Sequence, residues 1–442
     1  MATLTTEAQA RRTLDRVLAQ VRAKKGATGS ATLDHVRAGN TRFAVSEITS
    51  SANVERMQLT VTVQLGKRTA SATTNQLDDH ALADVAARAA RMAQLAPENP
   101  EAMPPLAAQT YRPAKGASDP ATVALGPDVR AAAAATAIAA ASRGVTIAGF
   151  HEHAARVRAL ATTAGAWGYH AWTTAGLSCT ARTPDGTGSG WAGASSHRAK
   201  DLDAAALAKL AVDKALGSQK PGRLDPGRYT VILEPAAVAD LLEFLLGALN
   251  ARRADEGRSF FSKPGNGTRV GDKLFPDTIT LRTDPTDAQL TATPFDRDGV
   301  PVQPTTWIDK GTIKGLVYSR FWASQKGKPA TGQPDAWVLE GGKATRDELI
   351  KGTKRGVLIT RFWYLRSLDP QTILVTGLTR DGVYLIDNGA IARPVNNFRF
   401  NESPVHMLAK CDALTAPAIA GGMRVPALRT HEFHLASISE AV

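Results

Sequence analysis

Alternation of apolar and polar residues is the feature that most restricts how the first part of this chain folds. Residues 57–65, Met-Gln-Leu-Thr-Val-Thr-Val-Gln-Leu, alternate with a period of two, which is typical of a half-buried β-strand. Gly66 then predicts a turn, and residues 68–74 predict a returning strand. Residues 5–25 and 81–95 instead space their apolar side chains as amphipathic helices do. We therefore expect helices packed on antiparallel strands.

A proline-rich stretch over residues 97–105 predicts a linker after this unit. We accordingly expect an N-terminal α+β domain over residues 1–110 and a middle domain over residues 111–225. The middle region is mixed. Its alanine-rich segments 128–141 and 201–216 predict helices, with short strands and glycine-rich turns between them.

From residue 226 onward the sequence becomes strand-rich, and we expect a third domain over residues 226–442. Its β-type runs are separated by turn signals, among which Asp387-Asn388-Gly389 is typical of a type I′ hairpin. The fold class expected for the whole chain is α+β. It combines a helix-flanked antiparallel N-terminal unit, a mixed middle region and a large antiparallel-sheet C-terminal domain with one amphipathic helix.

That helix is predicted to begin near Pro235, which suits the first turn of a helix. Its apolar residues fall on one stripe and comprise Val238, Leu241, Leu242, Leu245, Leu246 and Leu249. Asp240, Glu243 and Gly247 lie off this stripe. Any chemistry carried by the helix must therefore come from these positions.

Composition limits the class of protein. A chain of 442 residues with 43% hydrophobic content can bury several cores. With only two cysteines, no export signal and no apolar run of about 18 residues, we expect a cytoplasmic protein without membrane contact. The net charge of +12 invites a nucleic-acid hypothesis, but the basic residues are dispersed rather than clustered. Nucleic-acid binding is therefore the least favoured partner class.

Several segments resemble TldD/PmbA proteins, also called modulators of DNA gyrase. The N-terminal matches are Arg42-Phe-Ala-Val-Ser-Glu, Ser71-Ala-Thr-Thr-Asn and Leu95-Ala-Pro-Glu-Asn-Pro. The C-terminal matches are Glu256-Gly-Arg-Ser-Phe-Phe, Pro294-Phe-Asp-Arg-Asp-Gly-Val-Pro, Thr376-Gly-Leu-Thr-Arg-Asp-Gly-Val-Tyr-Leu-Ile-Asp-Asn-Gly and Pro394-Val-Asn-Asn-Phe-Arg-Phe-Asn-Glu-Ser. This resemblance covers nearly the whole chain.

The resemblance implies a two-subunit zinc metallopeptidase that acts on peptides or partly unfolded proteins. In the family's D-type subunit, a His-Glu-x-x-x-His helix and a later cysteine hold the zinc, with one position left for water. The matching positions here are Glu243, Phe244 and Ala248, and Cys411 falls near the ligand cysteine. The chain thus resembles the E-type member, with no catalytic residue and no metal of its own. Zinc is expected in a D-type partner, while this chain shapes the substrate chamber.

Polar and aromatic residues in the last third suggest a contact surface. On predicted strands, Asn and Arg side chains can hold the backbone of an extended peptide, while aromatic residues form walls. The same residues also suit a polar network at a subunit contact, and both interpretations stay open. The residues concerned are Arg361, Trp363, Tyr364, Asn396, Arg399 and Asn401.

Two further hypotheses follow from scattered residues. His151 and His153 stand two apart, which suits either a metal pair or a solvated polar patch. An autonomous peptidase, dependent on a metal or a thiol, would need a centre such as Cys411 with His406 or His151. A homodimer in the absence of a D-type subunit and a topoisomerase-associated binding role are further possibilities for the partner.

Overall fold

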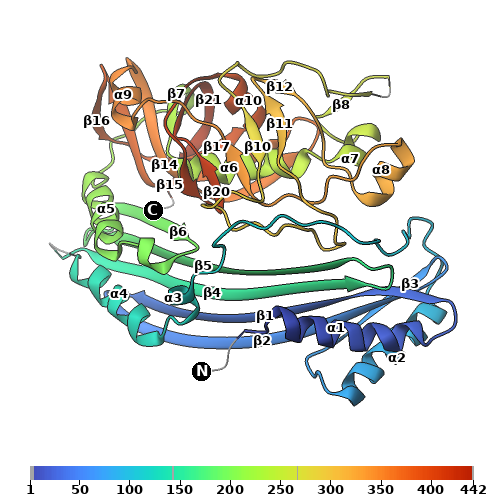
Figure 1. Ribbon diagram of the computed structural model, residues 1–442. Coiled ribbons are helices and arrows are strands. Elements are labelled where there is room, and N and C mark those ends of the chain that lie inside the picture. The colour runs from blue at the N-terminus through green and yellow to red at the C-terminus, as the bar shows by residue number, and fades with distance from the viewer. Residues whose placement is uncertain (1–3, 142–143, 266, 441–442) are drawn as a thin grey trace.

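A six-stranded antiparallel sheet forms the lower layer of the computed structural model, which describes residues 4–141, 144–265 and 267–440 (Figure 1). Its strand order is β3-β2-β1-β4-β5-β6. The strands are β1 (Ala27–Ala44), β2 (Glu47–Leu65), β3 (Arg68–Thr74), β4 (Thr146–Thr162), β5 (Trp167–Arg182) and β6 (Ser189–Ser196). Gly66 makes the predicted turn between β2 and β3 with a φ of 61°, in the left-handed region that favours glycine.

Helices cover the face of this sheet that points away from the upper layer (Figure 1). They are α1 (Glu7–Arg22), α2 (Asp79–Leu95), α3 (Pro120–Val123), α4 (Pro127–Ala139) and the 3₁₀ turn Ala199–Asp201. Helix α5 (Ala204–Gly217) lies at the β6 edge of the sheet and also reaches the upper layer, where the Tyr384 hydroxyl donates to the carbonyl of Lys214 at 2.9 Å. Helix α1 begins with a capping box, because the side chain of Thr6 accepts from the backbone N–H of Gln9 while the Gln9 side chain accepts from that of Thr6. The predicted helices of the N-terminal and middle regions are thus present.

The sheet is continuous across the region that the sequence divides at residue 110. Strands β1 to β3 precede that position and β4 to β6 follow it, yet β1 pairs with β4 from Ser30 opposite Thr162 to Phe43 opposite Gly149. The division at residue 110 therefore falls in a connection between two halves of one sheet. Pairing between strands this far apart in sequence leaves no local signal in the composition.

The upper layer contains a seven-stranded sheet with the order β14-β7-β21-β17-β15-β16, in which β18 also pairs with β21. An additional pairing of β14 with β15 closes five of these strands into a ring. The strands are β7 (Gly227–Leu233), β14 (Arg355–Asp369), β15 (Leu374–Asp387), β16 (Ala390–Pro394), β17 (Asn397–Glu402), β18 (Cys411–Leu414) and β21 (Leu428–Ser439). Asn388 and Gly389 both have positive φ between β15 and β16, as the predicted type I′ hairpin requires.

A second sheet of the upper layer has the order β12-β11-β10-β13-β20-β19. Its short strands are β10 (Leu281–Thr283), β11 (Thr305–Asp309), β12 (Thr312–Ile313), β13 (Trp337–Leu339), β19 (Ala418–Ala420) and β20 (Met423–Val425). A separate hairpin joins β8 (Ser262–Lys263) to β9 (Gly267–Thr268). The α+β class is confirmed, but the C-terminal region holds two large sheets where one was expected. The second sheet was not predicted because its strands are short and carry too few residues to show a period.

The C-terminal region also holds more than the single helix expected. Its helices are α6 (Pro235–Ala248), α7 (Ala251–Asp255), α8 (Arg320–Lys326), α9 (Arg346–Lys351) and α10 (Pro404–Ala409). Two of its strand pairs, β7 with β14 and β13 with β20, are parallel rather than antiparallel. Only α6 is long enough for its apolar stripe to be recognised in the sequence, and Leu241, Leu242 and Leu245 of this stripe are fully buried in a core shared by both upper sheets.

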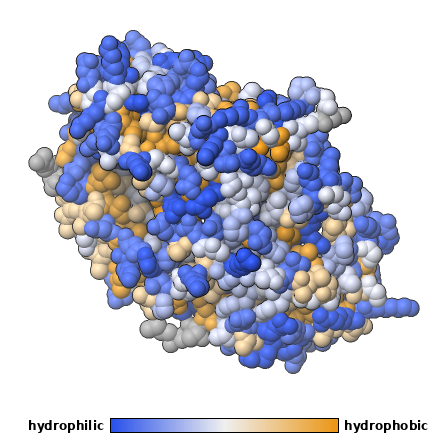
Figure 2. Space-filling model, turned by 45° about the horizontal axis from the view of Figure 1, so that its top comes forward, coloured by the Kyte–Doolittle hydropathy of each residue, from blue (hydrophilic) through white to orange (hydrophobic). Residues whose placement is uncertain are grey.

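Polar contacts join the two layers. Ser189 Oγ of β6 donates to a carboxylate oxygen of the buried Asp381 in β15 at 2.5 Å. Arg252 of α7 binds both carboxylate oxygens of Glu101, in the connection after α2, at 2.9 and 2.8 Å. On the surface, hydrophilic and apolar residues are interspersed over the face in Figure 2. Within the described ranges, no helix has both the length and the apolar character that crossing a membrane requires.

Candidate functional site

Helix α6 places the three positions that match the family's metal motif on the wall of one cavity. Glu243, Phe244 and Ala248 line a space of about 390 Å³ near the C-terminal end of the helix. The remaining lining residues are Gly247, Arg253, Arg258, Ser259, Ser367, Pro370 and Ile373. The positions that match the metal motif in the sequence therefore line a cavity in the structure.

The donors in this cavity do not fit a zinc ion. Three protein ligands are usual for a catalytic zinc, whereas Glu243 is the sole carboxylate among the lining residues and Phe244 and Ala248 offer no donor. Arg253 and Arg258 add positive charge to the same wall, which opposes binding of a dication. Among residues 4–141, 144–265 and 267–440, no group of three or more His, Cys, Asp or Glu is placed to hold a metal ion.

Cys411 lies in the core rather than at this cavity. Its side chain is 3% exposed, and its Sγ donates to the carbonyl oxygen of Ala413 at 3.7 Å. Burial raises the pKa of the Cys411 thiol to about 12. His406, the base considered for it, instead pairs through Nδ1 with Glu402 at 2.9 Å. These contacts leave the thiol protonated near neutral pH and the imidazole engaged elsewhere.

Half of the predicted groove residues lie together on β14. The Arg361 guanidinium is 4.5 Å from the ring centroid of Trp191 and 5.2 Å from that of Trp363. Trp363 and Tyr364 are 42% and 60% exposed. Beyond Ile359, β14 is paired with β15 alone, because its pairing with β7 ends at that residue. Here the backbone N–H of Phe362 bonds to Asp240 of α6, so this part of β14 lies beside that helix and carries two exposed aromatic side chains.

The other groove residues have different surroundings. Asn396 Oδ1 accepts from the backbone N–H of Leu224 at 2.7 Å, so this side chain fixes the connection that enters β7. Arg399 lies on β17, which pairs with β15 on one side and β21 on the other. Asn401 is opposite Thr376 of β15. Arg399 lies opposite Leu378, which in turn lies opposite Trp363, so Arg399 and Asn401 are one strand beyond β15 in the sheet that carries the β14 residues.

His151 and His153 are buried on the helix-covered face of β4, with 4% and 8% exposure. The interpretation of a solvated polar patch is therefore wrong. Arg130 of α4 lies over them and is itself fully buried, with Nη1 3.4 Å from His153 Nδ1 and Nη2 donating to Asn53 Oδ1 at 2.8 Å. A guanidinium at this distance works against a metal ion. The helices that cover this face come from elsewhere in the sequence and leave no signal beside these histidines.

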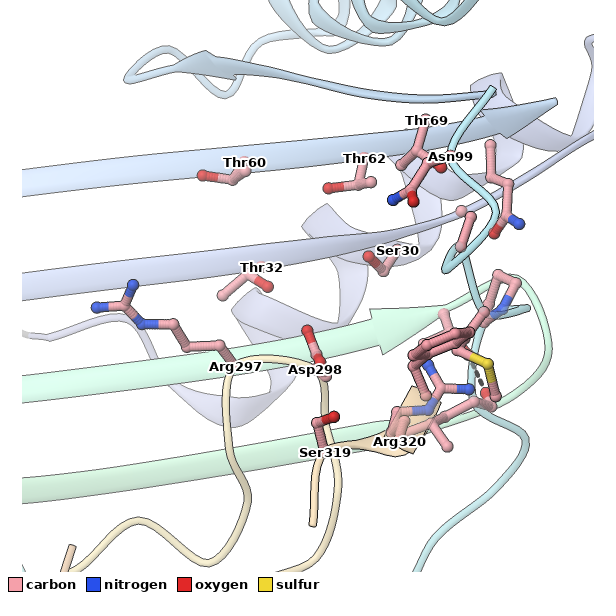
Figure 3. Close-up of a pocket in the computed structure, with 18 of the residues that line it drawn as sticks. Ser30, Thr32, Thr60, Thr62, Thr69, Asn99, Arg297, Asp298, Ser319 and Arg320 are labelled. Carbon is pink, nitrogen blue, oxygen red and sulfur yellow. Dashed lines mark hydrogen bonds between the residues drawn. The ribbon is translucent and has the colours of Figure 1, made fainter. Parts of the chain in front are cut away.

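A cavity of about 640 Å³ lies between the open face of the lower sheet and loops of the upper layer. Figure 3 shows its walls: hydroxyl and amide side chains on β1, β2, β3 and the connection after α2 face the 297–298 and 319–320 segments. The labelled residues are Ser30, Thr32, Thr60, Thr62, Thr69, Asn99, Arg297, Asp298, Ser319 and Arg320.

Most charged side chains at this cavity already bond to other groups of the protein. Asp34 accepts from Arg158 Nε at 2.7 Å, and Arg320 donates to the carbonyl of Pro104 at 2.6 Å. What remains is Arg297, Asp298 and a surface of hydroxyl and amide groups that can hydrogen bond to a polar, extended ligand. Sequence reasoning missed this surface, since the polar half of an alternating strand normally faces water.

The matches to family models define a metallopeptidase-related protein. Residues 226–437 match the model of the PmbA/TldA metallopeptidase C-terminal domain, and residues 116–219 match that of the PmbA/TldA metallopeptidase central domain. The chain belongs to the TldD/PmbA family, as the sequence motifs predicted.

Two curated relatives match part of the chain. A protein named "Metalloprotease" from Methanothermobacter thermautotrophicus is 23% identical over 227 residues, which is 47% of each chain. An uncharacterised protein from Methanocaldococcus jannaschii is 28% identical over 133 residues, or 30% of each chain. The chain thus matches less than half the length of either relative.

Solved structures show the same fold over nearly the whole chain. TldE from Thermococcus kodakarensis has a TM-score of 0.86 at 18% identity, and a candidate modulator of DNA gyrase from Thermotoga maritima has 0.85 at 18%. In both cases the match covers 96% of this chain and 100% of the other. A candidate modulator of DNA gyrase from Bacteroides thetaiotaomicron has 0.84 at 19%, covering 98% and 100%.

Proposed function

We propose that this chain is the E-type, non-catalytic partner subunit of a two-subunit zinc peptidase that acts on peptide or unfolded substrates. The observation that carries the proposal is the donor set on α6, where Phe244 and Ala248 stand at positions that would need imidazoles. A phenyl ring and a methyl group can neither ligate zinc nor accept the proton of a zinc-bound water. The zinc and the general base would then belong to a D-type subunit, and the pair would work in the cytoplasm.

In such an assembly this chain would contribute binding surface. The hydroxyl-lined cavity in Figure 3 offers hydrogen-bond partners that do not discriminate by charge, which suits the repeating amides of a peptide. The exposed side chains of Trp363 and Tyr364 on β14 can contact an extended peptide, from a substrate or from the partner subunit. Both features support a role in substrate handling rather than in bond cleavage.

A thiol-dependent peptidase is less well supported. A nucleophilic cysteine acts as the thiolate and needs access to its substrate. The Cys411 thiol is buried and its pKa is raised to about 12, so its thiolate is scarce at neutral pH.

The proposal is tested by metal analysis and peptidase assays of the purified chain, alone and mixed with a D-type subunit. We expect no stoichiometric zinc in the isolated chain and no cleavage of an unfolded protein until the D-type subunit is added. A full equivalent of zinc together with chelator-sensitive cleavage by this chain alone would refute the proposal.

A pair of matched variants sharpens the assay. In the assembled complex, Glu243→Gln in this chain should leave kcat within about twofold, because the side chain takes no part in the chemistry. The same change at the glutamate of the D-type motif should lower kcat by 10²-fold or more, as loss of a general base does. A large loss from Glu243→Gln would place part of the catalytic centre in this subunit.

A further inference from the structure

A second cavity between the two layers is built from both halves of the chain. Its volume is about 520 Å³, within the range of sites that bind small molecules. The lower layer supplies residues of β4, β5, β6 and α5, while α6, β14 and the β19–β20 turn close it from above. Such junctions between units of a chain are common places for ligand sites.

Part of the cavity wall is apolar. Phe150, Leu210 and Ile419 contribute aliphatic and aromatic surface. The Trp191 ring packs against Gly193, where a Cβ would lie 2.5 Å from it, and the Arg361 guanidinium lies 4.5 Å from its centroid. A ligand with an apolar body would find preformed contacts here.

The charged residues of the lining are three acids and two bases, although the chain as a whole carries a net charge of +12. They are Glu152, Lys214, Glu234, Asp240 and Arg361. Both bases already have acidic partners. Lys214 Nζ lies 2.6 Å from a Glu234 carboxylate oxygen, and Arg361 Nη1 lies 3.3 Å from Asp381. Arg346 Nη1 lies 3.1 Å from the other carboxylate oxygen of Glu234, so among the described residues Glu152 and Asp240 are the lining acids without an ion pair within 4 Å.

Asp240 is the more buried of these two acids. Among the described residues, no Lys, Arg or His nitrogen lies within 4 Å of its carboxylate. Burial raises the pKa of Asp240 to about 6, even though the charge of Arg361 and a backbone hydrogen bond from Phe362 lower it, while the charge of Glu243 adds to the rise. A desolvated carboxylate that faces a cavity gains most from a cation placed there.

We propose that this cavity binds a small organic cation, an ammonium or guanidinium group on an aliphatic stem, with Asp240 as its counter-ion and the Phe150, Leu210 and Ile419 surface around the stem. A metal ion is a poorer match, since one carboxylate is far from the six to eight oxygens that a hard cation such as Ca²⁺ requires. The site uses neither Glu243 nor the D-type partner, so it stands or falls independently of the proposed partner role.

The test is calorimetric titration of the isolated full chain with pentylamine and agmatine, and with pentanoate as the anion of matched length. At pH 7.5 we expect the two amines to bind and pentanoate not to bind. Asp240→Asn should weaken amine binding at least tenfold. Asp309→Asn, which removes an acid from β11 outside the cavity lining, should leave the Kd unchanged.

A second variant guards against loss of the fold in Asp240→Asn. Leu210 lines the cavity from α5 and is 43% exposed, so Leu210→Lys adds a cation there at little cost in packing. It should also weaken amine binding, by charge repulsion. The proposal would be overturned if pentanoate bound as well as the amines, or if the Kd were unchanged in both variants. It would also be overturned if neither amine gave heat at 10 mM, which is about ten times a millimolar Kd.

Discussion

At the scale of single residues, the lower sheet buries imidazoles in their neutral form. His153 lies near the Arg130 guanidinium, while His170 of β5 stacks on Trp172 with ring centroids 5.1 Å apart and an angle of 17°. Burial lowers the pKa of both histidines to about 4, and the positive charge of Arg130 adds to the effect at His153. Protonation of these rings is therefore coupled to loss of the native structure.

His170 gives a test of this coupling. Between pH 6.5 and pH 4 the unfolded chain binds a proton at this residue while the native chain does not, so its contribution to stability is complete above pH 6.5 and is lost as the pH falls. His170→Phe, which keeps the ring but cannot be protonated, should reduce the loss of unfolding free energy between pH 7 and pH 4.5 by about 2–3 kcal/mol. Urea unfolding at the two pH values measures it.

The control is His80→Phe at an exposed position on α2, which should leave the pH dependence as it is in the parent chain. An identical pH dependence for His170→Phe and the parent chain would mean that His170 is protonated in the native state as readily as in the unfolded one.

At the scale of elements, the two sides of helix α6 have different surroundings. Its apolar stripe is buried between the upper sheets, and its other side faces two cavities, one with Asp240 and one with Glu243 and Gly247. Glycine inside a helix costs conformational entropy without adding contacts. At Gly247 an added Cβ would meet no atom within 4 Å.

Gly247→Ala is therefore expected to stabilise the protein by about 0.5–1 kcal/mol, because alanine loses less backbone freedom on folding than glycine. The midpoint of urea unfolding should rise without a change in slope. The matched change is Gly39→Ala on β1, where the new Cβ would lie 2.4 Å from Arg130 Nη1 and 2.7 Å from Asn53 Oδ1. The free energy of unfolding of that variant should fall by about 1–3 kcal/mol, because the added Cβ overpacks the interior. The same sign for both variants would contradict this account.

At the scale of the whole molecule, Asp381 joins the two layers. Its side chain is 2% exposed, accepts from Ser189 Oγ at 2.5 Å and lies 3.3 Å from Arg361 Nη1. The same arginine stacks on Trp191, so β6 of the lower sheet and β14 and β15 of the upper one meet at a single cluster. This cluster borders the cavity proposed for organic cations.

Ser189→Ala should weaken the junction of the layers. The change removes one hydrogen-bond donor from a buried carboxylate and should cost about 1–3 kcal/mol of unfolding free energy. Urea unfolding measures the loss, and Ser195→Ala, at an exposed position on β6, is the control that should stay within about 0.5 kcal/mol. Equal stability of the two variants would show that this contact does not hold the layers together.

The sequence alone determined those features that depend on neighbours along the chain. The alternation in residues 57–65 predicts a strand, the apolar stripe of 235–249 predicts a helix, and Asn388-Gly389 predicts a hairpin, because each pattern is complete within a few residues. The same holds for Phe244 and Ala248, since the chemistry that a side chain lacks is fixed by its identity.

Only the tertiary structure decided which distant residues meet. Trp191, Asp240 and Arg361 line one cavity although they come from three separate parts of the sequence, and the His151 and His153 rings are buried by helices that their own strand does not contain. Burial, and with it the pKa of a carboxyl or an imidazole, depends on what packs against a group from elsewhere in the chain. Local periodicity holds no record of that packing, so the closed ring of strands and the cavities between the layers emerge only when the chain is folded.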